Sequence, residues 1–152
     1  MRIVDDIIGS KPAPDNIIGP DALVIEALAM LNSVNLSYLI VMEGNEYKGI
    51  FCERDYSRNV ILKGRSSNST SVKEVMTTDL PVVQSNDTVE HCMHVMNKNK
   101  ARYLVAYGPD NEFEGVITIH DLLRQVIANK ELVFDTSIAE QLISNDEKGD
   151  VY

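Results

Sequence analysis

The sequence has 152 residues, 44% of them hydrophobic, and its 14 basic and 23 acidic side chains give a net charge of −9. A chain of this length buries enough apolar surface to fold without disulfides or metals. The acidic balance argues against the basic face of a nucleic-acid-binding protein and against binding to anionic membranes.

Three further features lead us to expect a cytoplasmic protein. No apolar run approaches the ~20 residues that a membrane helix needs. The N-terminus becomes acidic at Asp5 and Asp6 and lacks the apolar core of a signal peptide. The two cysteines, Cys52 and Cys92, lie in unrelated contexts without a CxxC motif, so we expect two reduced, packed thiols.

The first part of the chain predicts a strand, a helix, two strands joined by a turn, and a second helix. The spacing of Val24, Leu28 and Leu31 gives the first helix one apolar face. The predicted elements are strand 16–18, helix 23–32, strands 36–42 and 47–51 with a turn at 43–46, and a helix that begins at Cys52.

A polar segment of small residues, 63–71, predicts a linker between the two halves of the chain. Residues 72–77 predict a short helical turn that leads into the second half. Residues 4–9 form its counterpart before the first half.

The second part repeats this order of elements. Its first helix can be capped by Asn86 or Asp87, and Val89, Met93 and Met96 recur at helical spacing. The predicted elements are strand 81–83, a helix along this apolar face, strands 102–107 and 113–117 with a turn at 108–112, a helix that begins at Thr118, a further helix over 129–143, and a frayed end over 144–152.

The two parts align residue by residue. Tyr38 matches Tyr103 at a spacing of 65 residues, and after one inserted residue Asp55 matches Asp121 at a spacing of 66. A repeat this short cannot bury its apolar face alone, so we expect the two copies to pack on each other. The expected fold is α+β, with two tandem β-α-β-β-α repeats related by pseudo-two-fold symmetry. The expected domains are residues 1–62, a linker at 63–71, residues 72–128, and a C-terminal helix and tail at 129–152.

A seven-residue signature occurs in both copies: a glycine, two apolar residues, a hydroxyl residue, two variable residues and an aspartate. It spans 115–121 in the second copy and 49–55 in the first, where Cys52 replaces the hydroxyl residue. With the lead-in at 74–77 and the helix start at 87–89, this pattern resembles the cystathionine-β-synthase (CBS) domain family, in its tandem arrangement called a Bateman module. The segments 53–58 and 63–67 look like those of stand-alone two-repeat members.

The resemblance implies a regulatory, energy-sensing module that catalyses nothing and needs no catalytic cofactor. Such pairs bind AMP, ADP, ATP or S-adenosylmethionine in the cleft between the repeats, and two pairs often associate, which implies a homodimer. We expect a stand-alone module without a fused effector domain, which regulates a separate effector protein of unknown identity. The family also contains pairs without a known ligand, so a ligand-free adaptor is the main alternative.

The signature residues have a physical interpretation as a nucleotide site. Asp121 can accept hydrogen bonds from a ribose diol, and Thr118 with free helix N–H groups suits a phosphate. Arg102 can neutralise phosphate, and the strand at Val83 can offer backbone groups to an adenine edge. The expected ligand-binding residues are Asp121, Thr118, Arg102, Tyr103, Val83, Thr77, Asp55, Cys52, Arg58, Tyr38 and Ile18.

Each of these assignments has a structural alternative. Thr118 and Asp121 also fit a capping box, in which each side chain pairs with the other residue's backbone N–H. Tyr38 and Tyr103 can lie over an adenine or pack in a core, and Arg58 and its equivalent Arg124 can reach a phosphate or face water. His91 and His94 have a spacing compatible with metal ligands, but no third ligand follows in an obvious position. An enzyme or redox protein that uses Cys52 or these histidines is the least favoured alternative.

The two predicted sites are unequal, and we expect the second to bind more tightly. It has Thr118 and Arg102 where the first has Cys52, a weak donor, and Ser37. Loss of one hydrogen bond to a charged group costs ~1.5–3 kcal/mol, which is about tenfold or more in affinity. Asp121→Ala should therefore abolish the tight phase of nucleotide binding in calorimetry, while Asp55→Ala should leave most of it. The opposite pattern would show that the first site is the stronger.

Overall fold

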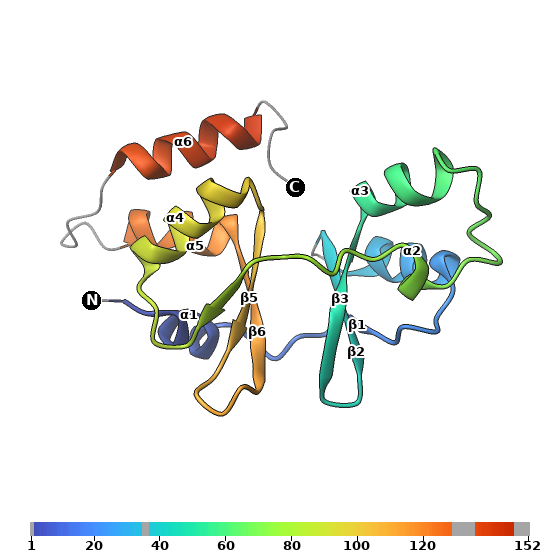
Figure 1. The fold of residues 1–152 in the computed structure, drawn as a ribbon, viewed down its shortest axis with the longest axis horizontal. Helices are drawn as coiled ribbons and strands as arrows, with labels where there is room; N and C mark the ends of the chain where they lie inside the picture. The colour runs from blue at the N-terminus through green and yellow to red at the C-terminus, as the bar shows by residue number, and fades with distance from the viewer. Residues whose placement is uncertain (1, 35–36, 129–135, 148–152) are drawn as a thin grey trace. The chain divides into compact units, whose positions relative to one another are not determined.

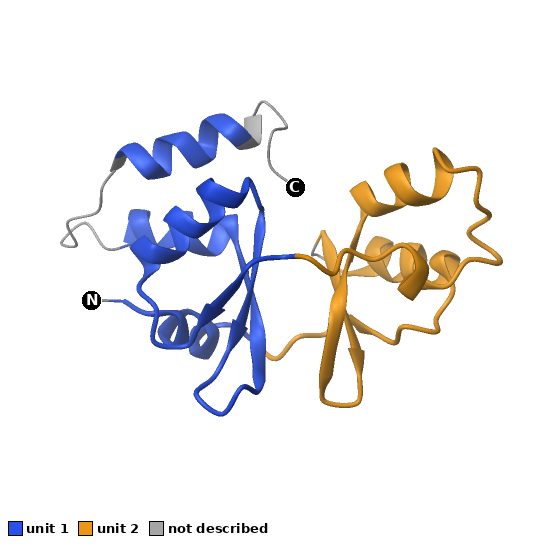
Figure 2. Cartoon of the chain, viewed as in Figure 1, with its two compact units in different colours: residues 1–12, 80–152 blue, residues 13–79 orange. Residues whose placement is uncertain are grey.

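The computed structural model describes residues 2–34, 37–128 and 136–147 (Figure 1). The chain divides into two compact units, each with its own three-stranded sheet (Figure 2). Unit 1 contains residues 1–12 and 80–152, and unit 2 contains residues 13–79. Each unit therefore holds one complete copy of the sequence repeat, and the α+β class is confirmed.

Unit 2 is built on the sheet β1-β2-β3, in which β1 runs parallel to β2 and β2 runs antiparallel to β3. A π-helix follows the single turn of α3, so the second helix of this copy is wider than a regular α-helix. The elements are β1 (Ile17–Ile18), α2 (Val24–Ser33), β2 (Tyr38–Glu43), β3 (Glu46–Cys52), α3 (Glu53–Asp55), the π-helix η1 (Tyr56–Ile61) and the 3₁₀ turn η2 (Val72–Glu74).

Unit 1 repeats this topology in the sheet β4-β5-β6. Register shifts occur at Val41/Met42 in β2 and at the equivalent Ala106/Tyr107 in β5, so the two sheets share even their irregularity. The elements are α1 (Val4–Ser10), β4 (Val82–Gln84), α4 (Val89–Asn99), β5 (Tyr103–Tyr107), β6 (Phe113–Thr118), α5 (Ile119–Ala128) and α6 (Thr136–Glu147).

A short segment precedes each copy of the repeat: residues 4–11 before the first copy and residues 72–77 before the second. Each of these lead-in segments packs on the copy that it does not precede. Helix α1 precedes the first copy, but Val4 and Ile7 lie in the core of unit 1, and the Val4 N–H donates to the Asp87 carbonyl at 2.9 Å. Conversely, η2 precedes the second copy, but Val72 lies in the core of unit 2 and its N–H donates to the Ala22 carbonyl at 2.8 Å. The compact units therefore have boundaries near 12 and 79, unlike the boundaries at 62, 63 and 72 that the repeat predicts.

Two glycines allow the lead-ins to approach the sheets. A Cβ on Gly49 would lie 2.6 Å from the Thr77 carbonyl oxygen, and a Cβ on Gly115 would lie 2.8 Å from Cδ1 of Ile8. The contact at Gly49 is with a backbone oxygen and leaves no room for a side chain. At Gly115 the neighbour is the end of the Ile8 side chain, and the positive φ of 157° adds a backbone constraint that favours glycine. The signature glycine is thus required where a strand meets the lead-in of the other copy.

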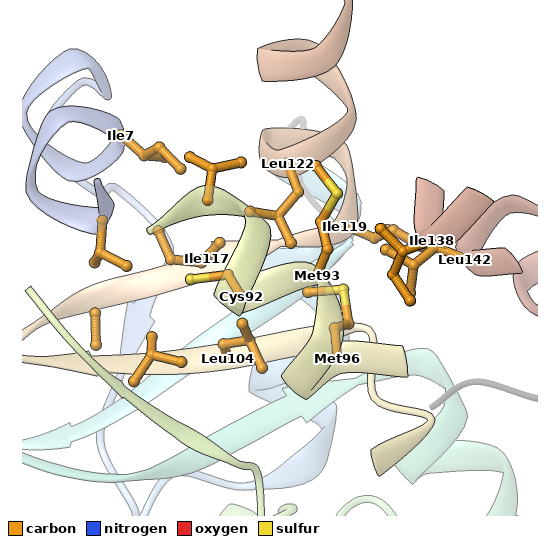
Figure 3. Close-up of a cluster of buried hydrophobic side chains, with 14 of the residues drawn as sticks. Ile7, Cys92, Met93, Met96, Leu104, Ile117, Ile119, Leu122, Ile138 and Leu142 are labelled. Atoms are coloured by element: carbon orange, nitrogen blue, oxygen red, sulfur yellow. The ribbon is translucent and has the colours of Figure 1, made fainter. Parts of the chain in front are cut away.

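Each unit has one hydrophobic core. In unit 1 the core joins β5, β6 and the helices α4 and α5, and α6 adds Ile138, Ala139 and Leu142 (Figure 3). In unit 2 the core lies between the sheet and α2, around Leu39 and Phe51. Within residues 2–34, 37–128 and 136–147, no helix is both long and apolar enough to cross a membrane.

Two helix ends differ from the sequence-based expectation. The N-cap of α4 is Thr88, whose hydroxyl accepts from the His91 N–H at 3.0 Å, and not Asn86 or Asp87. The Asp87 carboxylate instead accepts from the Gln84 N–H at 2.7 Å and closes the preceding turn. Helix α6 extends beyond the expected end at Ile143 to Glu147, while residues 129–135 and 148–152 lie outside the described part of the chain.

The packing of α6 predicts a large cost for Leu142→Ala. Leu142 is fully buried in the core of unit 1, so truncation should lower the free energy of unfolding by ~2–5 kcal/mol. Urea unfolding measures this value. The adjacent Ile143 is 43% exposed and provides the matched control, since Ile143→Ala should change stability by less than about 1 kcal/mol. Equal effects of the two substitutions would contradict the observed packing of α6.

Candidate functional site

Each unit carries one buried aspartate at the start of a helix. Asp55 is 0% exposed and Asp121 is 5% exposed, and they are the only carboxylates buried among the described residues. Each lies three residues after the last residue of the third strand in its sheet. A buried carboxylate is costly unless donors surround it, so the partners of these two groups define the candidate sites.

Asp121 forms a reciprocal capping box with Thr118. The Thr118 N–H donates to Asp121 Oδ2 at 2.9 Å, and the Asp121 N–H donates to Thr118 Oγ1 at 3.1 Å. The capping interpretation of this pair is therefore confirmed as local structure. Because its oxygen accepts this bond, the Thr118 hydroxyl keeps its own proton for another acceptor.

Lys11 is a second partner of Asp121 and was not predicted from the sequence. Its Nζ lies 2.8 Å from Asp121 Oδ2 and donates to the Val116 carbonyl at 2.9 Å. Arg124 approaches from the solvent side, with 3.6 Å between its Nη1 and Asp121 Oδ1, and its side chain is 74% exposed. The carboxylate thus lies between one partly buried and one exposed cation.

Asp55 has the same capping arrangement without a lysine. Its Oδ2 accepts from the Cys52 N–H at 2.9 Å and contacts Cys52 Sγ at 3.4 Å. Its Oδ1 accepts from the Thr77 hydroxyl at 2.6 Å. Thr77 is held in place by two backbone hydrogen bonds with Ile50, at 2.8 and 2.9 Å.

Lys11 and Thr77 occupy equivalent places in the two units. Thr77 pairs with the backbone of Ile50, and Lys11 donates to the carbonyl of Val116, which matches Ile50 in the repeat. Lys11 also precedes Thr77 by 66 residues, the same spacing that relates Asp55 to Asp121. This spacing is the sequence signal that could have identified Lys11. It is informative only if one knows that each lead-in packs on the copy that it does not precede.

Burial changes the acid–base properties of the site in unit 2. Loss of solvent raises the pKa of Asp55, and the hydrogen bonds from Thr77 and Cys52 act in the opposite direction. Burial, together with the nearby Asp55 charge, raises the pKa of Cys52 to about 11. The Cys52 side chain is therefore a neutral thiol at physiological pH and a weak donor.

The other predicted ligand residues differ in how accessible they are. Tyr38 and Tyr103 are buried at the first positions of β2 and β5. The side chains of Ile18 and Val83 belong to the two cores, so only their backbones are available to a ligand. Arg102 is half-buried just before β5, and Arg58 is exposed on η1.

The two histidines that have the spacing of metal ligands lie on the exposed side of α4. His91 and His94 are more than half exposed on α4 and lie near Asp87 and Glu90, respectively. In the part of the chain that the structure describes, no three His, Cys, Asp or Glu side chains gather closely enough to hold a metal ion.

Comparison with known proteins identifies a known domain in the second copy. The family model described as "CBS domain" matches residues 72–128. The chain is 33% identical over 112 residues to the Arabidopsis thaliana mitochondrial CBS domain-containing protein CBSX3, an alignment that covers 70% of this chain and 54% of that protein. The chain thus spans about half the length of this curated relative.

Two solved structures match this chain over nearly the whole of their own length. The crystal structure of the CBS domain NE2398 is 32% identical, with a TM-score of 0.75, and covers 84% of this chain and 99% of that one. A signal-transduction protein with CBS domains from Burkholderia ambifaria, described as putative in its own structure report, is 29% identical with a TM-score of 0.75, and covers 87% of this chain and 98% of that one.

The burial of both cysteines predicts a pH-dependent thiol reactivity. Burial raises the pKa of Cys52 to about 11 and that of Cys92 to about 12, above the ordinary value of 9.0. Their protonated forms thus favour the folded state fully below pH 9, and this contribution falls as the pH rises toward 11. A colorimetric thiol reagent at pH 8 should find no reactive thiol in the native protein and two after unfolding. Fast native modification would instead support the redox alternative.

Proposed function

Because the chain belongs to the CBS domain family, we propose that it is a regulatory module that binds an adenine nucleotide and catalyses no reaction. The observation that carries this proposal is the buried carboxylate of Asp121. Its Oδ2 accepts from Thr118 and Lys11, while Oδ1 has only the exposed Arg124 at 3.6 Å among the described contacts. A vicinal diol of ribose supplies the neutral donors that this remaining oxygen can accept.

The groups around Asp121 suit the rest of a nucleotide. The Thr118 hydroxyl lies at the start of α5, where the helix dipole favours an anion, although the backbone N–H groups of Thr118, Ile119 and Asp121 already have acceptors. Arg102 and Arg124 add positive charge on a molecule of net charge −9. Tyr103 and the backbone of Val83 are proposed to contact the adenine base.

The site around Asp55 is proposed to be the weaker one. Both of its oxygens already accept hydrogen bonds, from Thr77 and from Cys52, and the residue is fully buried. A diol would have to share Asp55 Oδ1 with the Thr77 hydroxyl, on a carboxylate that is more deeply buried than Asp121. In this unit Arg58, Tyr38 and the backbone of Ile18 complete the proposed site.

A structural neighbour supports the ligand class. CBSX2, solved in complex with AMP, has the same fold with a TM-score of 0.68 and 22% identity. Its ligand is the reason to prefer an adenine nucleotide over S-adenosylmethionine for this chain. Binding in the cleft between the two repeats stays a prediction from the sequence, as does a cytoplasmic location.

A homodimer is also proposed. Ile61 and Ile127 occupy equivalent positions near the ends of the second helices and are 57% and 73% exposed. Exposed apolar side chains at the same place in both copies suit contact with a second molecule. Such a dimer is proposed to regulate a separate effector protein.

Nucleotide binding predicts thermal stabilisation. At ~100 times the dissociation constant a ligand adds ~2.7 kcal/mol, which should raise the melting temperature by a few degrees. A melting screen against AMP, ADP, ATP and S-adenosylmethionine tests this, with GMP as the control for a phosphate without adenine. A shift with S-adenosylmethionine alone would change the ligand. No shift with any adenosine compound at millimolar concentration would favour a ligand-free adaptor.

A further inference from the structure

The clearest difference between the two candidate sites is the lead-in residue whose side chain donates a hydrogen bond to the buried aspartate. In unit 1 this residue is Lys11, and in unit 2 it is Thr77. We propose that Lys11 makes the unit 1 site selective for the phosphorylated form of its adenosine ligand, and that the unit 2 site lacks this selectivity. This inference rests on the proposed function and concerns the same site.

The ammonium group of Lys11 is fixed in place. Two of its three donors are used, one by Asp121 Oδ2 at 2.8 Å and one by the Val116 carbonyl at 2.9 Å. The side chain is 27% exposed, so the cation is partly withdrawn from solvent but not sealed from it. An ammonium group held in this way loses little further freedom when a phosphate approaches, and its third donor can turn toward that phosphate.

The charge around the two aspartates differs accordingly. Lys11 neutralises the carboxylate of Asp121, and Arg124 adds a second cation at 3.6 Å from it. The hydrogen-bond partners of Asp55 are instead neutral groups of Thr77 and Cys52. Arg58, the equivalent of Arg124, also acts on Asp55 as a nearby positive charge. Lys11 is therefore the cation that distinguishes the two carboxylates, and an anionic ligand meets one more positive charge in unit 1 than in unit 2.

A purely structural role for Lys11 does not account for this difference. Thr77 shows that a neutral hydroxyl is sufficient to hold the equivalent aspartate, and its hydrogen bond of 2.6 Å is as short as the Lys11 ion pair. The fold thus tolerates either residue at this position. What the lysine adds is a positive charge beside the carboxylate that we assign to the ribose.

Lys11→Thr tests the proposal, because it gives unit 1 the arrangement observed in unit 2. Calorimetry with AMP and with adenosine measures the ratio of the two dissociation constants. Wild-type protein should prefer AMP about tenfold or more, the affinity equivalent of one charge-assisted hydrogen bond. Lys11→Thr should reduce this preference to about threefold or less, whereas Lys11→Arg, which keeps the charge, should retain the preference.

Lys73→Thr is the matched control. Lys73 is an exposed lysine in the other lead-in that pairs with Asp21 at 2.8 Å, so its replacement should not alter the ratio. Lys11→Gln, which is neutral and close in length, replaces Lys11→Thr if the latter fails to fold. Conversely, Thr77→Lys should strengthen AMP binding at the weaker site.

The outcomes separate this inference from the proposed function. If the protein binds AMP but the neutral Lys11 variants keep the wild-type ratio, the role of Lys11 is wrong and nucleotide binding stands. An equal loss of AMP and adenosine affinity would show a structural role and would also overturn the inference. If wild-type protein binds neither AMP nor adenosine, the proposed function fails, and this inference fails with it.

Discussion

Compensation of a buried carboxylate is the constraint on which the other features of each unit depend. Asp55 and Asp121 are withdrawn from water at the first turn of a helix, where an isolated charge would be strongly destabilising. One set of donors comes from the residue that ends the preceding strand, through the backbone N–H of Cys52 or Thr118. The other comes from a lead-in segment that is distant in the sequence. The strand end, the helix start and the lead-in are therefore held together by one side chain.

This constraint explains why the lead-ins must approach the sheets so closely. The lead-in residue reaches the aspartate only if its backbone or its neighbours pass directly over the third strand. Gly49 provides the space for Thr77 in unit 2, and Gly115 provides the space for Ile8 in unit 1. The glycine and the aspartate of the signature are thus two parts of one arrangement, since the first admits the segment that compensates the second.

The two copies keep this arrangement and differ in its charge. The sheets share their strand order, their register shift and the position of the capped helix. The substitutions that distinguish the sites are at the helix start, where Cys52 matches Thr118, before the second strand, where Ser37 matches Arg102, and in the lead-in, where Thr77 matches Lys11. A duplicated fold can in this way present two sites of similar shape with different preferences for anions.

The sequence by itself determined the features that depend on neighbouring residues, while the tertiary structure decided those that join distant segments. The repeat predicts the order of strands and helices, and the spacing of Thr118 and Asp121 predicts their capping box, because a helix start is stabilised by residues three positions apart. The pair of Lys11 and Asp121 joins residues 110 positions apart. Both lead-ins have similar apolar patterns, so no local rule says on which copy each one packs. Only the complementary fit of α1 to the core of unit 1, and of η2 to that of unit 2, makes this choice.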